Sequence, residues 1–139
     1  MNGWCFTGPT TDYSLLTIHD SHSQATKMID YNDRIFRSVS NSANGEVSYE
    51  TVFHYKQHGF NITATYSGGN ITDGSLSATA DEAGNLNMRY QHINTRGEFL
   101  TGVCFSKPEI MPNGKIRLHE KWQWTCGDYS QGESVVEEI

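Results

Sequence analysis

Turn signals at regular spacing constrain this chain more than any other feature. Gly and Asn recur in short groups, and both residues tolerate the positive φ angles that tight hairpin turns require. The segments between them are roughly 8 to 11 residues long and rich in Thr, Val, Ile, Tyr and Phe, which is typical of β-strands. The groups are Asn44-Gly45, Ser67-Gly68-Gly69-Asn70, Ala83-Gly84-Asn85, Thr95-Arg96-Gly97, Pro112-Asn113-Gly114 and the run 127–132.

These signals predict an all-β fold of eight strands. No segment carries apolar residues at helical spacing over three turns, and parallel strands would need long crossover connections. Short connections favour an antiparallel up-and-down meander, which eight strands can close into a barrel; a two-sheet sandwich is the alternative. The expected strands are 31–39, 47–57, 60–67, 70–80, 85–93, 98–106, 115–125 and 133–138.

The chain of 139 residues fits one domain with an N-terminal extension. Residues 1–27 are rich in Ser, Thr, Asp and His, and we expect them to be irregular. Residues 28–139 carry the strand pattern and form the expected barrel domain. Aromatic residues make up 12% of the chain, which supplies enough large side chains for a core without disulfide bonds.

Charge and cysteine content exclude several classes of partner. The net charge of −6 disfavours nucleic acid and anionic membrane surfaces as partners. Cys5, Cys104 and Cys126 form no metal-binding pair, and their odd number fits a reducing cytoplasm better than a secreted scaffold. The N-terminus lacks a basic start and a long apolar run, so we expect no signal peptide, and no stretch is long enough to span a membrane.

Alternation with period two separates an apolar and a polar face on the later strands. In strand 115–125 the apolar face comprises Ile116, Leu118, Glu120, Trp122 and Trp124. In strand 85–93 it comprises Leu86, Met88, Tyr90 and His92. The same spacing predicts Phe99, Thr101, Val103 and Phe105 for strand 98–106, and Tyr49, Thr51, Phe53 and Tyr55 for strand 47–57.

Glu120 and His92 are the strongest candidate site residues, because each interrupts an apolar face. A carboxylate inside a barrel requires a partner, so the two could meet and orient a small polar ligand. Alternatively, Glu120 lies near a barrel mouth or pairs with a buried Arg. The expected pocket walls are Trp122, Trp124, Tyr90, Phe53, Tyr55 and Tyr66, although aromatic residues are also ordinary core.

Signals for catalysis and for metal binding are weak. The chain has neither a Gly-x-Ser-x-Gly nucleophile motif nor a phosphate-binding loop. His19 and His22 have a spacing that could hold a metal, but no third ligand follows nearby. We therefore expect no catalytic residue, no metal and no cofactor.

Residues 32–139 resemble a family of small bacterial proteins that carry the name N-acetylglutamate synthase. The matching phrases are FRSVSNS (36–42), TVFHYKQHG (51–59), ATYSGG (64–69), GNLNMRYQHIN (84–94), TGVCFSKPE (101–109), PNGKIRLHEKWQWTCGD (112–128) and the closing Glu137-Glu138-Ile139. The name implies an acyltransferase. No Gly-rich turn leads into a helix that would bind the pyrophosphate of acetyl-CoA, so the name assigns no catalytic residue to this chain.

The pattern is also similar to that of the calycins, the lipocalin-like and avidin-like barrels. The ending Trp122-Gln123-Trp124-Thr125-Cys126-Gly127 loosely resembles a late strand of avidin. This resemblance implies a calycin-like barrel that binds a small ligand. Two alternatives stay open: an acyltransferase, and a fully packed barrel that acts through its outer surface and could form a homodimer.

Overall fold

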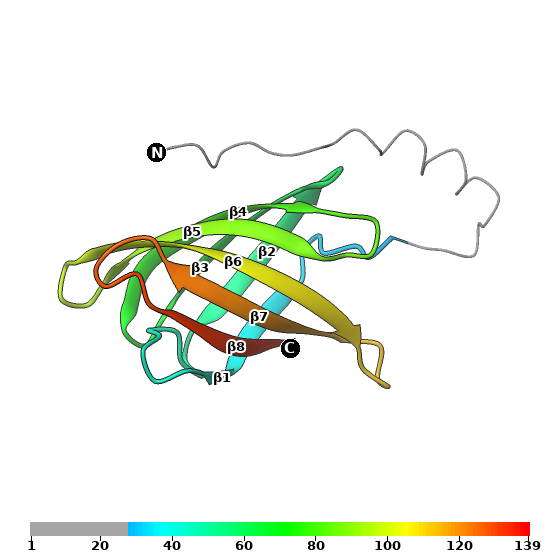
Figure 1. Cartoon of the computed structure of the whole chain (residues 1–139). Coiled ribbons are helices and arrows are strands. Elements are labelled where there is room, and N and C mark those ends of the chain that lie inside the picture. The colour runs from blue at the N-terminus through cyan, green and yellow to red at the C-terminus, as the bar shows by residue number, and fades with distance from the viewer. Residues whose placement is uncertain (1–27) are drawn as a thin grey trace.

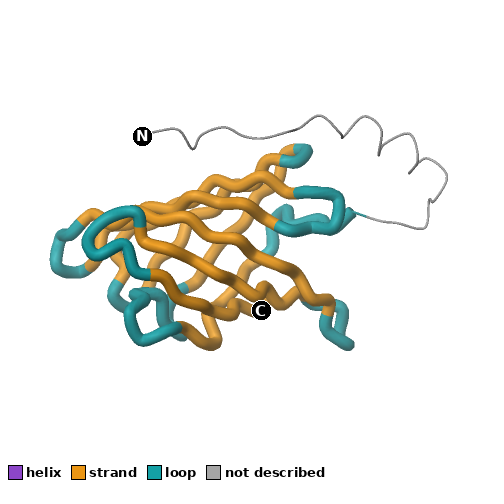
Figure 2. Tube along the Cα trace, in the orientation of Figure 1, coloured by secondary structure: helices purple, strands orange, loops and turns teal. Residues whose placement is uncertain are grey.

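The structure is a computed structural model that describes residues 28–139 (Figure 1). The described chain consists of strands and loops (Figure 2), and it contains no helix that could span a membrane. The strands are β1 (Ile35–Asn41), β2 (Val52–His58), β3 (Asn61–Gly68), β4 (Ile71–Ala80), β5 (Leu86–Asn94), β6 (Phe99–Ile110), β7 (Ile116–Trp124) and β8 (Gln131–Glu138).

The eight strands form a closed antiparallel up-and-down barrel. Each strand pairs with the next, and β1 pairs with β8 to complete the ring. The predicted fold class is therefore confirmed, and closure excludes the sandwich. Three predicted boundaries are wrong: β1 begins at Ile35, β2 begins at Val52, and β6 extends to Ile110.

The barrel has one packed end and one hollow end. Because neighbouring strands are antiparallel, the odd-numbered strands all begin at the same end. The first inward residues of these strands fill this end, which is the packed one. Tyr31, in the segment before β1, closes it and donates a hydrogen bond from its Oη to the Gly84 carbonyl at 2.6 Å. The packed side chains include Tyr31, Phe36, Tyr55, Ile62, Leu86, Ile116, Leu118 and Val136, all at most 2% exposed.

The predicted inward faces are confirmed for β5 and β7 but reversed for β6. Phe99 is 77% exposed and Phe105 is 42% exposed, whereas Gly102, Cys104 and Ser106 face the interior. These three inward residues of β6 are small, and large side chains from β5 and β7, such as Tyr90 and Trp122, occupy the space beside them. The positions of the apolar side chains in the sequence therefore predicted the wrong inward face for β6.

The face predicted for strand 47–57 is correct only from Thr51 onward. Thr51, Phe53 and Tyr55 are buried. Tyr49 lies before β2 and is 65% exposed, with the Arg37 guanidinium 4.7 Å from the centre of its ring. Residues 42–51 form a loop instead of a continuous strand, and this loop lies at the hollow end, where β1 ends and β2 begins.

Candidate functional site

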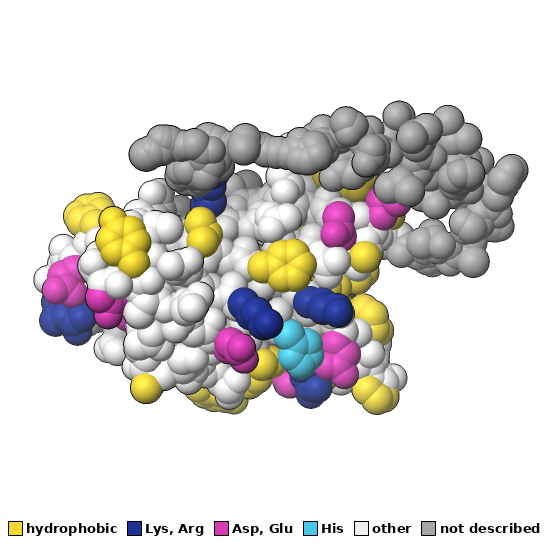
Figure 3. Space-filling model, viewed as in Figure 1, with side chains coloured by type: hydrophobic (Ala, Val, Ile, Leu, Met, Phe, Trp, Pro, Cys, Tyr) yellow, Lys and Arg dark blue, Asp and Glu magenta, His cyan; other side chains and the backbone are white. Residues whose placement is uncertain are grey.

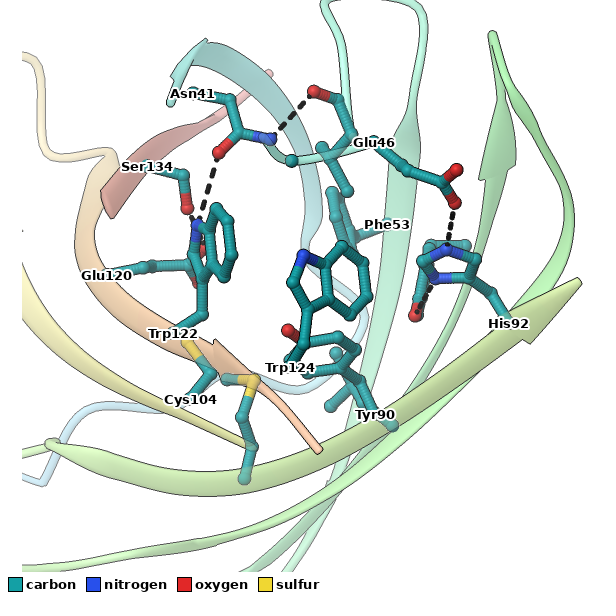
Figure 4. Close-up of a pocket in the computed structure, with 15 residues that line it drawn as sticks. Asn41, Glu46, Phe53, Tyr90, His92, Cys104, Glu120, Trp122, Trp124 and Ser134 are labelled. Carbon is teal, nitrogen blue, oxygen red and sulfur yellow. Dashed lines mark hydrogen bonds and ion pairs between the residues drawn. The ribbon is translucent and has the colours of Figure 1, made fainter. Parts of the chain in front are cut away.

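The hollow end of the barrel contains a cavity of about 50 Å³ (Figure 4). A buried water molecule needs about 10–15 Å³, so the cavity has room for several groups of that size. Of the predicted site residues, Phe53, Tyr66, Tyr90, His92, Glu120, Trp122 and Trp124 border it. Tyr55 does not, because it is buried at the packed end against Phe36, with ring centroids 4.8 Å apart.

Three aromatic walls of the cavity lie over cross-strand glycines. Tyr66 is opposite Gly74, Tyr90 is opposite Gly102, and Trp122 is opposite Gly132. A Cβ atom added to any of these glycines would overlap the facing ring. The missing side chains let the rings lie along the barrel wall, which leaves the lumen open. The cavity therefore depends on small residues as much as on large ones.

Glu120 reaches the cavity from the middle of β7 and is held by two hydroxyl groups. Ser106 Oγ donates to Glu120 Oε2 at 2.9 Å, and Ser134 Oγ donates to Oε1 at 3.0 Å. Burial raises the pKa of the Glu120 carboxyl above its usual value, and the two hydrogen bonds partly oppose this rise. The alternative prediction of a buried Arg partner is wrong, because no ion pair of the described residues includes Glu120.

His92 lies between two hydrogen-bonding partners, Tyr66 and Glu46, at the hollow end of the barrel. Its Nδ1 lies 3.0 Å from Tyr66 Oη, and its Nε2 lies 2.7 Å from Glu46 Oε1. Donation of Nε2–H to Glu46 would leave Nδ1 free to accept from the Tyr66 hydroxyl. Burial raises the pKa of Tyr66 far above its usual value, so the phenol stays protonated and acts as a donor. His92 and Glu120 border the same cavity but bond to different partners.

The loop 42–51 closes part of the cavity mouth and was predicted only as a turn and the start of a strand. Trp122 Nε1 donates to Asn41 Oδ1 at 3.1 Å, and Trp124 Nε1 donates to the Asn44 carbonyl at 3.1 Å. Glu46 in this loop accepts a hydrogen bond from Asn94 Nδ2 at 2.9 Å. Both indole N–H groups are thus bonded within the protein, and Figure 4 shows the bond of Trp122 to Asn41.

Asn41, Glu46, Cys104 and Ser134 border the cavity but were not predicted as site residues. Ser134 and Cys104 sit on inward positions of β8 and β6, so correct register for those strands would have indicated them. Glu46 had no such signal, because its position depends on how the loop 42–51 folds back.

The described residues offer little for metal binding or nucleophilic catalysis. They contain no cluster of three His, Cys, Asp or Glu side chains that could hold a metal ion. Burial raises the pKa of the Cys104 thiol well above its usual range, so it stays protonated. The weak metal candidates His19 and His22 lie outside the described residues. The arrangement is suited to holding a small molecule between aromatic rings and one carboxyl group.

The raised pKa of Glu120 predicts how stability changes with pH. The unfolded chain loses this proton at the usual pKa of 4.5, whereas the folded chain keeps it to higher pH. This contribution to stability is therefore complete below the unfolded pKa and is lost as pH rises through the folded pKa.

We expect the free energy of unfolding of the wild type to fall relative to that of Glu120→Gln as pH rises above 4.5. Urea denaturation between pH 4 and 8 measures this difference. Glu133→Gln, at an exposed position of β8, is the control and should leave the pH profile unchanged. Parallel profiles for the wild type and Glu120→Gln would contradict the expectation.

Comparison with known proteins gives one positive result. Residues 29–139 match the sequence model of a family described as avidin-like protein. Searches of curated proteins and of solved structures give no match. The family match agrees with the calycin-like resemblance of the sequence, whereas nothing in it supports the name N-acetylglutamate synthase. Because the match covers the entire barrel, the chain belongs to the avidin-like family.

Proposed function

We propose that this barrel binds a small, partly polar ligand in the cavity at its hollow end. The observation that carries the proposal is an aromatic-walled lumen bordered by two carboxyl groups, Glu120 on the inward face of β7 and Glu46 in the loop 42–51. Pockets for small molecules combine mostly apolar walls with a few placed polar groups. Family membership supports the same function, because avidin-like proteins bind small ligands such as biotin.

The size of the cavity limits the ligand. A space of about 50 Å³ suits a compact molecule or one end of a larger one. A ligand as large as biotin would require the loop 42–51 to move away from Trp124, which donates to the Asn44 carbonyl in this loop. Screening therefore needs compact fragments as well as larger metabolites.

The two alternatives have less support. An acyltransferase that works through an acyl-enzyme would need an ionised nucleophile, whereas burial keeps the Tyr66 phenol and the Cys104 thiol protonated. A fully packed barrel does not fit an open lumen. The outer face in Figure 3 mixes acidic, basic and single hydrophobic side chains. A homodimer and a cytoplasmic location both stay predictions; the free thiols of Cys104 and Cys126 are compatible with that location.

A thermal-shift screen against compact metabolites, biotin, and acetyl-CoA with glutamate tests the proposal. A ligand at about one hundred times its dissociation constant stabilises the fold by about 2.7 kcal/mol, which shifts the melting temperature measurably. Hits should also change tryptophan emission, and Trp122→Phe and Trp124→Phe should each reduce that change. Unchanged melting with every compound would contradict the proposal, and a hit with acetyl-CoA would favour the acyltransferase.

A further inference from the structure

The charges around the cavity are unbalanced. Among the described residues that border it, two carry carboxyl groups, Glu46 and Glu120, and none is Lys or Arg. Glu46 has compensation, because Arg96 Nη2 lies 3.3 Å from its Oε2 and His92 bonds to its Oε1. Glu120 has no cationic partner among the described residues. The cavity therefore holds one carboxyl group whose negative charge, when present, is not matched by the protein.

Glu120 still has unused hydrogen-bonding capacity. Each of its oxygens accepts one serine hydroxyl, whereas an ionised carboxylate can accept about four hydrogen bonds. Glu120 is one of the residues that border the cavity. A buried ionised group is destabilising unless a cation or further donors reach it. The two serines fix the direction of the carboxyl group but do not neutralise it.

The aromatic walls favour positive charge as well. Glu120, Trp122 and Trp124 alternate along the inward face of β7, and the two indole centroids are 5.5 Å apart. Tyr90 lies edge to face with Trp124 at 5.8 Å. The faces of these rings carry partial negative charge, which attracts ammonium and amidinium groups and repels anions.

From these observations, and resting on the proposed function, we infer that the ligand is a small organic cation. Its ammonium or amidinium group bonds to Glu120, and its compact apolar body contacts Trp122, Trp124 and Tyr90. Such a cation supplies the missing charge and uses the free lone pairs of Glu120. An anionic ligand would meet an unpaired carboxylate and negative ring faces instead.

Binding of this kind depends on ionisation of Glu120. The other titratable groups that interact with its charge are uncharged, because burial raises the pKa of each of them: Tyr31, Tyr55, Tyr66, Tyr90 and Cys104. His92 and Glu46 border the cavity too, but they bond to each other. A cation should therefore bind more tightly as pH rises and displace a proton from Glu120.

Three probes of nearly the same shape, each small enough for a cavity of about 50 Å³, test the inference: acetamidine, which is a cation, acetamide, which is neutral, and acetate, which is an anion. Titration of the full chain is followed by tryptophan fluorescence and checked by calorimetry. We expect acetamidine to bind at least about tenfold more tightly than acetamide and acetate to bind more weakly than both. The affinity for acetamidine, and not for acetamide, should increase between pH 4.5 and 7.

Glu120→Gln should reduce acetamidine affinity at least about tenfold and change acetamide affinity by less than about threefold. The exposed variant Glu133→Gln is the matched control. Should Glu120→Gln fail to fold, the pH series on the wild type decides alone. Tighter binding of acetamide or acetate, flat pH dependence, or a hit in the metabolite screen without binding of acetamidine would overturn the inference of a cationic ligand and leave the proposed cavity binder intact. No binding of these probes, together with a flat metabolite screen, would overturn both proposals.

Discussion

Gly102→Ala should close the cavity while the barrel stays folded. A methyl group at position 102 would overlap Cζ and Oη of Tyr90, so the ring must leave the wall of β6 and turn into the lumen. Overpacking of this kind destabilises a core by about 1–3 kcal/mol. The same displacement should reduce occupancy of the cavity at least about tenfold.

Xenon measures this change without knowledge of the natural ligand, because it binds apolar cavities in proteins. We expect xenon to shift NMR signals of residues such as Leu76 and Met88 in the wild type but not in Gly102→Ala. Adding Tyr90→Leu should restore xenon binding, and the double-mutant cycle should give a coupling free energy of about 0.5–3 kcal/mol. Unchanged xenon binding in Gly102→Ala would show that Tyr90 does not form the wall as described.

The fold could be predicted from the sequence because its signals are local. Hairpin turns depend on Gly and Asn within a few residues, and alternation along β5 and β7 sets which side chains point inward. Seven of the eight proposed site residues border one cavity, because side chains alternate between the two faces of a strand and these residues occupy inward positions. Whether those residues bind a ligand stays a prediction.

The parts that could not be predicted depend on contacts between distant segments. Gly102 and Ser106 face the interior because Tyr90 and Glu120 come from neighbouring strands, so hydrophobicity within β6 pointed to Phe99 and Phe105 instead. Glu46 reaches His92 only after the loop 42–51 folds over the mouth. Tyr55 was placed correctly inside the barrel but at the wrong end, because alternation gives no position along the barrel axis.

The β3–β4 turn lies in close contact with the loop 42–51, and we expect this contact to contribute strongly to the stability of the barrel. Gly68 has a φ of +119°, which L-residues with a side chain rarely adopt. Its Cα also faces the backbone of Glu50, so an added Cβ would overlap the Glu50 carbonyl oxygen. Thr51, fully buried, donates from its Oγ1 to the Gly68 carbonyl at 3.1 Å and fixes this approach.

We expect Gly68→Ala to lower the free energy of unfolding by about 3–5 kcal/mol, since strain in the backbone and a clash with backbone atoms act together. Gly97→Ala is the matched control, because Gly97 also has a positive φ, of +79°, but has no atom within 4 Å of an added Cβ. Backbone strain alone should make Gly97→Ala less stable by about 1–2 kcal/mol.

Urea denaturation measures the loss in both variants. The extra loss in Gly68→Ala combines the clash with the Glu50 backbone and the greater strain of a side chain at a φ of +119° than at +79°. Equal losses would contradict the expectation and would show that the loop 42–51 can move away from Gly68 without measurable cost. A larger loss for Gly68→Ala is the expected result, and it would indicate that the β3–β4 turn holds the loop 42–51, which contains Glu46, in place at this point.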